Sequence, residues 1–161
     1  MKRLSFILIL TYLFFIVEFL LFSAFGPWGT PNLILILIIF FNLYLGIRYG
    51  LLSAFCAGVI KDSFTTGVFG TNIFLFMSCA FLATILRRNF YRPGSRLSRI
   101  MVTAGVVTAF VLAQVLLRSM EQELNFGDIF QFVFLPEIVL TIGSATFVFN
   151  KLKELAVRFQ I

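Results

Sequence analysis

The stretch that decides the fold reads GIRYGLLSAFCAGVIKD and covers residues 46–62. Within it Gly46, Gly50, Ala54, Gly58 and Asp62 recur at every fourth position. Side chains four residues apart lie one above another on the same face of a helix. Residues 50–62 are therefore predicted to form one helix whose face of small residues ends in a carboxylate. The rest of the chain supplies apolar helices that can pack against this face.

The composition is that of an integral membrane protein. Of the 161 residues, 60% are hydrophobic and 12% are charged, and the mean hydropathy is +1.03. A soluble domain carries about 25% charged residues. The chain has no histidine, which removes the commonest catalytic base and metal ligand. Its two cysteines, Cys56 and Cys79, lie in apolar runs and are predicted to be buried small hydrophobes.

Turn-forming residues divide the chain into six apolar runs within a single domain of residues 1–161. The predicted membrane-spanning helices cover about residues 4–25, 31–46, 50–66, 71–86, 100–117 and 129–149. The first run is long enough to cross a bilayer and is predicted to be a retained helix, not a signal peptide. A turn is expected over residues 46–50, and a basic tail is expected after residue 150.

The distribution of basic residues predicts the orientation. If both ends of the chain are cytoplasmic, 11 lysines and arginines fall in cytoplasmic segments, and Lys61 and Arg118 fall outside. Cytoplasmic loops carry an excess of such residues. The net charge of +6 is therefore interpreted as a topology signal that also favours contact with anionic lipid, and no nucleic-acid partner is expected.

Asp62 is the acidic residue with the most specific expected role. Residues 50–62 span only about 20 Å, so the hairpin to the next helix is expected to be compact, with Asp62 near the outer interface. As an ion, Asp62 can accept hydrogen bonds from the backbone of the Gly67–Gly70 turn and fix the hairpin. The alternative is a solvated carboxylate beside Lys61. The sequence leaves both readings open.

The remaining polar and small residues have structural and functional interpretations. Gly50, Ala54 and Gly58 favour close packing within the chain, but the same residues suit a docking face for a partner's helix. Charges inside a membrane are expected to face the protein interior or a cavity. This expectation concerns Glu18 and Glu137. Interhelical hydrogen bonds are expected from Asn42, Asn72 and Gln114. No catalytic motif, metal-ligand set or cofactor-binding pattern occurs in the sequence, so a non-enzymatic protein without a metal or cofactor is predicted.

The segment from Pro31 to Arg88 resembles the MreD family of small bacterial rod shape-determining membrane proteins. A proline opens an apolar span, and an arginine, small residues at every fourth position, an aspartate and a glycine-bearing turn follow. These residues are Pro31, Arg48, Gly50, Ala54, Gly58, Asp62, Gly67 and Gly70. Asn32 departs from the family pattern, in which an acid often follows the proline.

The resemblance implies a role in the cell-elongation complex of the bacterial inner membrane. Proteins of this family bind MreC and help to link the actin-like MreB to the wall synthase RodA and its transpeptidase, so no catalytic residue is implied. The family is also similar in fold to the six-helix substrate-binding subunits of energy-coupling-factor transporters. The alternative function is therefore a small-molecule-binding transporter subunit, with Asp62, Asn72 and Glu137 lining an outward-open pocket.

Overall fold

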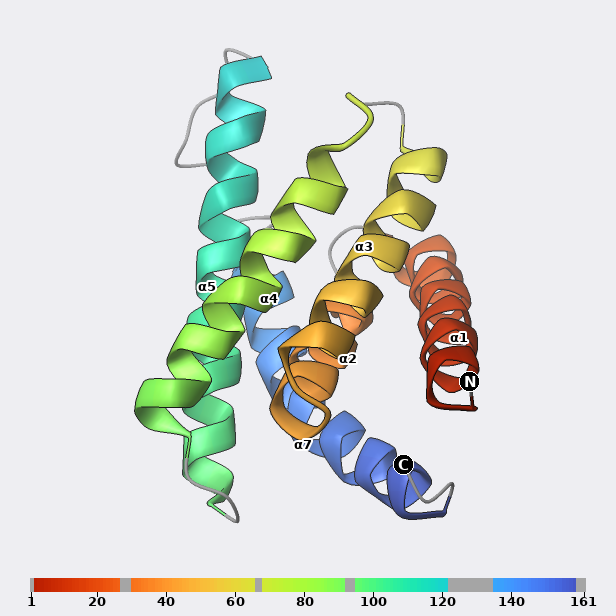
Figure 1. The fold of residues 1–161 in the computed structure, drawn as a ribbon. Coiled ribbons are helices and arrows are strands. Elements are labelled where there is room, and N and C mark those ends of the chain that lie inside the picture. The colour runs from red at the N-terminus through yellow and green to blue at the C-terminus, as the bar shows by residue number, and fades with distance from the viewer. Residues whose placement is uncertain (1, 27–29, 66–67, 92–94, 122–134, 159–161) are drawn as a thin grey trace.

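The computed structural model describes residues 2–26, 30–65, 68–91, 95–121 and 135–158. These residues form six α-helices, and Figure 1 shows α1 and α5 on opposite sides of the molecule. In chain order they are α1 (Lys2–Phe25), α2 (Leu33–Tyr44), α3 (Ile47–Phe64), α4 (Thr71–Phe90), α5 (Arg96–Glu121) and α7 (Leu135–Arg158). The all-helical prediction is confirmed for the described part of the chain. Each helix falls in or overlaps one predicted span.

The predicted turn over residues 46–50 is wrong in its length. Helix α3 already begins at Ile47, so Arg48 and Tyr49 lie in its first turn. The reversal is confined to Leu45 and Gly46, whose N–H groups both donate to the carbonyl of Phe41. Gly46 adopts φ of 99°, a left-handed conformation that glycine tolerates without steric cost. A single glycine is enough to reverse the chain here.

Two basic segments that follow predicted spans, after residue 86 and after residue 149, are partly helical. Helix α4 continues through Arg87 and Arg88 to Phe90, and α7 continues through Lys151 to Arg158. Lysine and arginine are good helix formers, so the end of an apolar run does not by itself end a helix. The sixth predicted span begins at residue 129, and its part before residue 135 lies outside the described residues.

Helix α2 is the central element of the molecule. It contacts α1, α3, α4, α5 and α7. Every residue from Leu33 to Leu43 is buried, which is the environment expected for a helix that is apolar on all sides. Its 12 residues extend only about 18 Å, less than the ~30 Å hydrocarbon core of a bilayer. The second predicted span is therefore a short core helix enclosed by longer ones.

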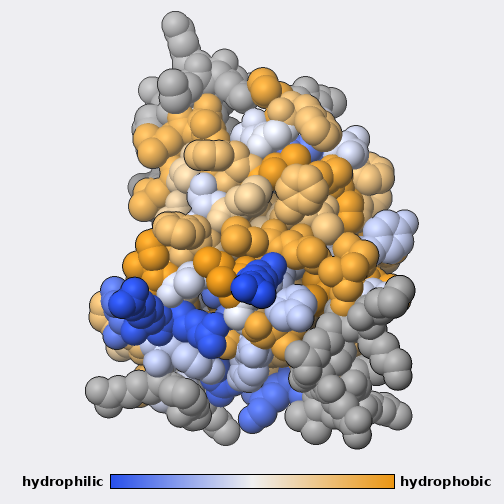
Figure 2. All heavy atoms as spheres, in the orientation of Figure 1, coloured by the Kyte–Doolittle hydropathy of each residue, from blue (hydrophilic) through white to orange (hydrophobic). Residues whose placement is uncertain are grey.

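Among the described residues, three helices are long and apolar enough to cross a membrane. These segments are Leu4–Phe25, Thr71–Phe90 and Leu97–Leu117. Helix α1 exposes large apolar side chains such as Ile9 (65%), Leu20 (60%) and Phe25 (67%). Figure 2 shows hydrophobic residues over most of the visible surface, and hydrophilic residues gathered toward its lower end. The chain is an integral membrane protein.

Candidate functional site

The carboxylate of Asp62 joins α3 to the start of α4. Its Oδ2 accepts hydrogen bonds from the N–H groups of Gly70 (3.0 Å) and Ile73 (3.2 Å). Its Oδ1 accepts from the backbone N–H of Asn72 (3.0 Å) and from the Asn72 side-chain amide (2.8 Å). The expected hydrogen bonds to the hairpin are therefore present from Gly70 onward, and Gly67 lies outside the described residues.

The geometry also shows what Asp62 can do chemically. An ionised carboxylate has two oxygens with about four lone-pair sites, and Asp62 accepts four hydrogen bonds, two on each oxygen. The residue is 95% buried, so the solvated alternative is wrong. Gly70 at the N-cap position has no side chain to cap α4, and Asp62 supplies the acceptor from α3. Negative charge at a helix N-terminus is also favoured by the helix dipole.

Glu18 likewise accepts a hydrogen bond from a backbone N–H group at the start of another helix, α2. Its Oε2 accepts the N–H of Ile34 at 3.0 Å, and its Oε1 forms a salt bridge with Lys61 Nζ at 2.9 Å. Glu18 belongs to α1 and Lys61 to α3, so this pair ties three helices together. Lys61 is one of the two basic residues that the orientation prediction places outside. Its ammonium group pairs with Glu18 and lies 5.5 Å from the ring centre of Phe76.

The N–H groups at the start of α2 all have acceptors. Leu33 donates to the carbonyl of Pro31, Ile34 to Glu18, and Leu35 to the side chain of Asn32. Ile36 donates to the carbonyl of Asn32. The first N–H groups of a helix have no partner inside it, and burying them unpaired is unfavourable. The start of α2 can therefore be buried because other segments supply these acceptors.

Helix α7 meets the start of α2 from another side. The backbone N–H of Asn32 donates to Thr141 Oγ1 at 3.0 Å, and its side-chain amide donates to Glu137 Oε1 at 3.4 Å. Glu137, which was expected either in the interior of its span or near the span's outer end, lies in the first turn of α7. We call three groups of bonded residues at this end of the molecule the Asp62 junction: Asp62 with Asn72, Glu18 with Lys61, and Asn32 with Glu137 and Thr141. It links α1, α2, α3, α4 and α7.

The small-residue face of α3 packs inside the chain. A Cβ added at Gly50 would lie 2.9 Å from Asn42 Cβ of α2, and one added at Gly58 would lie 2.5 Å from Ile73 Cα of α4. Ala54, between them, is fully buried. Of the two predicted roles, helix packing is the one observed. A partner's helix cannot use this face while α2 and α4 occupy it.

Polar contacts at the opposite end of α2 hold its C-terminus. The Asn42 side-chain amide donates to the carbonyl of Ala80 (2.7 Å) and to Thr84 Oγ1 (2.9 Å). Arg87 donates to the carbonyl of Asn42 at 2.8 Å, which places a cation at a helix C-terminus. The interhelical role predicted for Asn42 is confirmed. Gln114 is half-buried in α5, and Arg48 is exposed at the start of α3.

Sequence reasoning missed the Glu18–Lys61 pair and the role of Asn32. Counted from the starts of their predicted spans, Glu18 is 14 residues along and Lys61 is 11. Both spans are predicted to cross in the same direction. Opposite charges at similar depth were a signal for pairing. Asn32 occupies the position before the first apolar run, which is where an N-cap residue is expected.

Comparison with known proteins places the chain in a family. The family model described as rod shape-determining protein MreD matches residues 1–153. No curated protein and no solved structure matches the chain. The match covers the whole Asp62 junction and every helix except the last residues of α7. The chain belongs to the MreD family of rod shape-determining proteins.

Proposed function

We propose that this protein is a non-enzymatic scaffold of the bacterial cell-elongation complex. It resides in the inner membrane with six spans and both ends in the cytoplasm. It binds MreC and, through that complex, helps to connect MreB with RodA and its transpeptidase. The observation that carries this proposal is the match to the MreD family over residues 1–153.

The use of the polar residues supports a scaffold. Asp62, Glu18 and Asn42 each bond to backbone groups of other helices. A carboxylate that caps a helix with all its acceptor sites occupied has no free site for a substrate or a proton. The Asp62 junction therefore acts as a brace, which keeps the α3–α4 hairpin in one conformation.

The contact with MreC is assigned to this hairpin instead of the small-residue face. The hairpin exposes three large apolar side chains, Phe64 (69%), Val68 (71%) and Phe69 (66%). Phe64 lies against Phe15 and Phe19 of α1, with ring centres 5.1 and 6.4 Å away. Val68 and Phe69 lie between the end of α3 and the start of α4, at the turn that we place near the outer face of the membrane, so we assign them to a protein contact instead of to lipid. Asp62 holds the start of α4 next to this surface through its bonds to Gly70 and Ile73.

The transporter alternative receives less support from these contacts. It requires Asp62, Asn72 and Glu137 to line an outward-open pocket. Asp62 and Asn72 hydrogen-bond to each other, and Glu137 bonds to Asn32. These side chains are engaged with one another and with helix ends.

Replacement of the endogenous protein tests the proposal. In a rod-shaped bacterium that lacks its own MreD, expression of this chain with its cognate MreC should restore rods, and MreC should co-purify with it. Native mass spectrometry of the same preparation reports any small molecule that is retained. Round cells, no MreC and a stoichiometric small molecule would favour the transporter subunit instead.

A further inference from the structure

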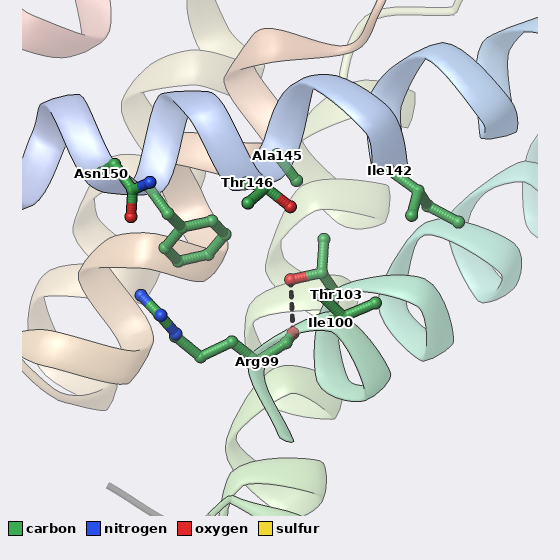
Figure 3. A pocket seen from close by; sticks show the side chains of 8 residues that line it. Arg99, Ile100, Thr103, Ile142, Ala145, Thr146 and Asn150 are labelled. Atoms are coloured by element: carbon green, nitrogen blue, oxygen red, sulfur yellow. Dashed lines mark hydrogen bonds between the residues drawn. The ribbon is translucent and has the colours of Figure 1, made fainter. Parts of the chain in front are cut away.

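An open groove lies between α5 and α7, at the end of the molecule where α2 and α4 finish. Its enclosed volume is about 20 Å³, so most of the groove is open at the surface of the molecule. Its lining residues are Arg99, Ile100, Thr103, Ile142, Ala145, Thr146, Phe149 and Asn150. Figure 3 shows Arg99 and Asn150 toward one end of the groove and Ile100 and Ile142 toward the other. The groove is thus polar at one end and apolar at the other.

Arg99 is the charged group of this groove. Its guanidinium donates to the hydroxyl of Tyr44 at 3.3 Å. The salt bridges among the described residues are Lys61–Glu18 and Lys151–Glu154, and neither includes Arg99. A guanidinium has five N–H donors in a fork that fits a phosphate group. Arg99 therefore has donors left for an anion that enters the groove.

The order of the lining residues along the helices matches the shape of a phospholipid. On α7, Asn150 and Ile142 are eight residues apart, which corresponds to about 12 Å along the helix axis. On α5, Thr103 lies one turn beyond Arg99, and its hydroxyl bonds to the Arg99 carbonyl at 2.8 Å, as Figure 3 shows. A headgroup at Arg99 would thus place an acyl chain along Ile100 and Ile142.

The surrounding charge favours a lipid with a negative headgroup. Exposed cations from three different helices lie toward the same end as Arg99. They are Arg48 in the first turn of α3, Arg88 in the last turns of α4, and Lys151, which is next to Asn150 on α7 and is also paired with Glu154. Clusters of such residues at a membrane surface attract anionic lipid.

We propose that the α5–α7 groove binds one anionic phospholipid, with its phosphate on Arg99 and an acyl chain against Ile100, Ile142 and Phe149. Asn150 and Thr146 offer further hydrogen-bonding groups to the headgroup. The site would join α5 to α7 by a lipid at the end of the molecule opposite the Asp62 junction.

Native mass spectrometry of the full-length protein released from micelles tests this site. Phosphatidylglycerol is compared with zwitterionic phosphatidylcholine, for the wild type, Arg99→Gln, and Arg88→Gln as the matched control outside the groove. Retention of phosphatidylglycerol by Arg99→Gln should fall roughly fivefold, whereas Arg88→Gln, which removes the same charge from outside the groove, should lower it much less. Equal retention by the two variants would overturn the proposal.

A second variant keeps Arg99 and closes the groove. Thr146 is exposed on α7, so Thr146→Trp should leave folding intact and block the lipid. If Thr146→Trp retained as much phosphatidylglycerol as the wild type, a site in this groove would be contradicted. Inorganic phosphate in millimolar excess should leave the lipid bound, because phosphate lacks the acyl chain. Complete displacement by phosphate would show an anion site that is not a lipid site.

Discussion

At the scale of single residues, two carboxylates act as N-caps from neighbouring helices. An N-cap residue normally accepts hydrogen bonds from its own helix. Asp62 of α3 instead accepts from the first N–H groups of α4, and Glu18 of α1 accepts from Ile34 of α2. Lys61 pairs with Glu18 at 2.9 Å, so the partly buried charge of Glu18 is neutralised. These charged side chains are therefore tolerated inside the membrane protein, because they bond to the N–H groups at helix ends or to a side chain of opposite charge.

Replacement of Asp62 by asparagine tests this use of charge. The Asp62→Asn variant is almost isosteric, but one of its two terminal groups becomes a donor facing N–H donors. The free energy of unfolding should fall by about 1.5–3 kcal/mol, the usual worth of a hydrogen bond to a charged group. Ser63→Ala is the control, because Ser63 is exposed and its hydroxyl donates to the carbonyl of Val59 within its own helix. Equal stability of the two variants in denaturant titrations of the micelle-bound protein would refute the capping role.

At the scale of elements, α3 and α4 form a hairpin whose backbones meet at Gly58. A Cβ added at Gly58 would lie only 2.5 Å from the Cα of Ile73. The N–H of the same residue, Ile73, donates to Asp62. Close approach and capping therefore depend on each other. Separating the two helices to admit a side chain at position 58 would also lengthen the hydrogen bond between Ile73 and Asp62.

Two glycine-to-alanine substitutions should have opposite effects. Gly58→Ala forces α3 away from α4 and should lower the free energy of unfolding by about 1–3 kcal/mol, the usual range for overpacking. Gly143→Ala in α7 would place its Cβ more than 4 Å from any described atom outside its own helix, so it should stabilise by roughly 0.5–1 kcal/mol through helix propensity. Thermal unfolding of both variants in the same detergent checks the signs. Stabilisation by Gly58→Ala would contradict the packing described here.

Hydropathy and small-residue spacing were enough to predict the helices and the compact hairpin at Asp62. The pairing of Glu18 with Lys61 and the enclosure of α2 could not be predicted with the same certainty, because they depend on which helices become neighbours. The length of α2 was also a weak signal, since an apolar run of this kind suits both a span and a core helix. The two roles weighed for Gly50 and Gly58 require the same residues, so only the three-dimensional arrangement separates them.

At the scale of the whole molecule, polar contacts hold the core helix at both ends. The Asp62 junction surrounds the start of α2, and Asn42 with Arg87 holds its end. Apolar surface covers much of the rest, including the exposed side of α1, as expected for contact with lipid. The tip of the α3–α4 hairpin is an exposed apolar surface that Asp62 holds in one conformation. We assign the contact with MreC to this surface.

The most direct test of this assignment is the amount of MreC that co-purifies with Phe69→Ser. Phe69 is 66% exposed at the hairpin tip, and Phe147, its control, is 68% exposed on α7. Loss of one aromatic anchor worth about 1.4 kcal/mol weakens binding roughly tenfold. Phe69→Ser should therefore retain about a tenth as much MreC as the wild type, while Phe147→Ser should retain it fully. Full retention by Phe69→Ser would contradict the scaffold surface proposed here.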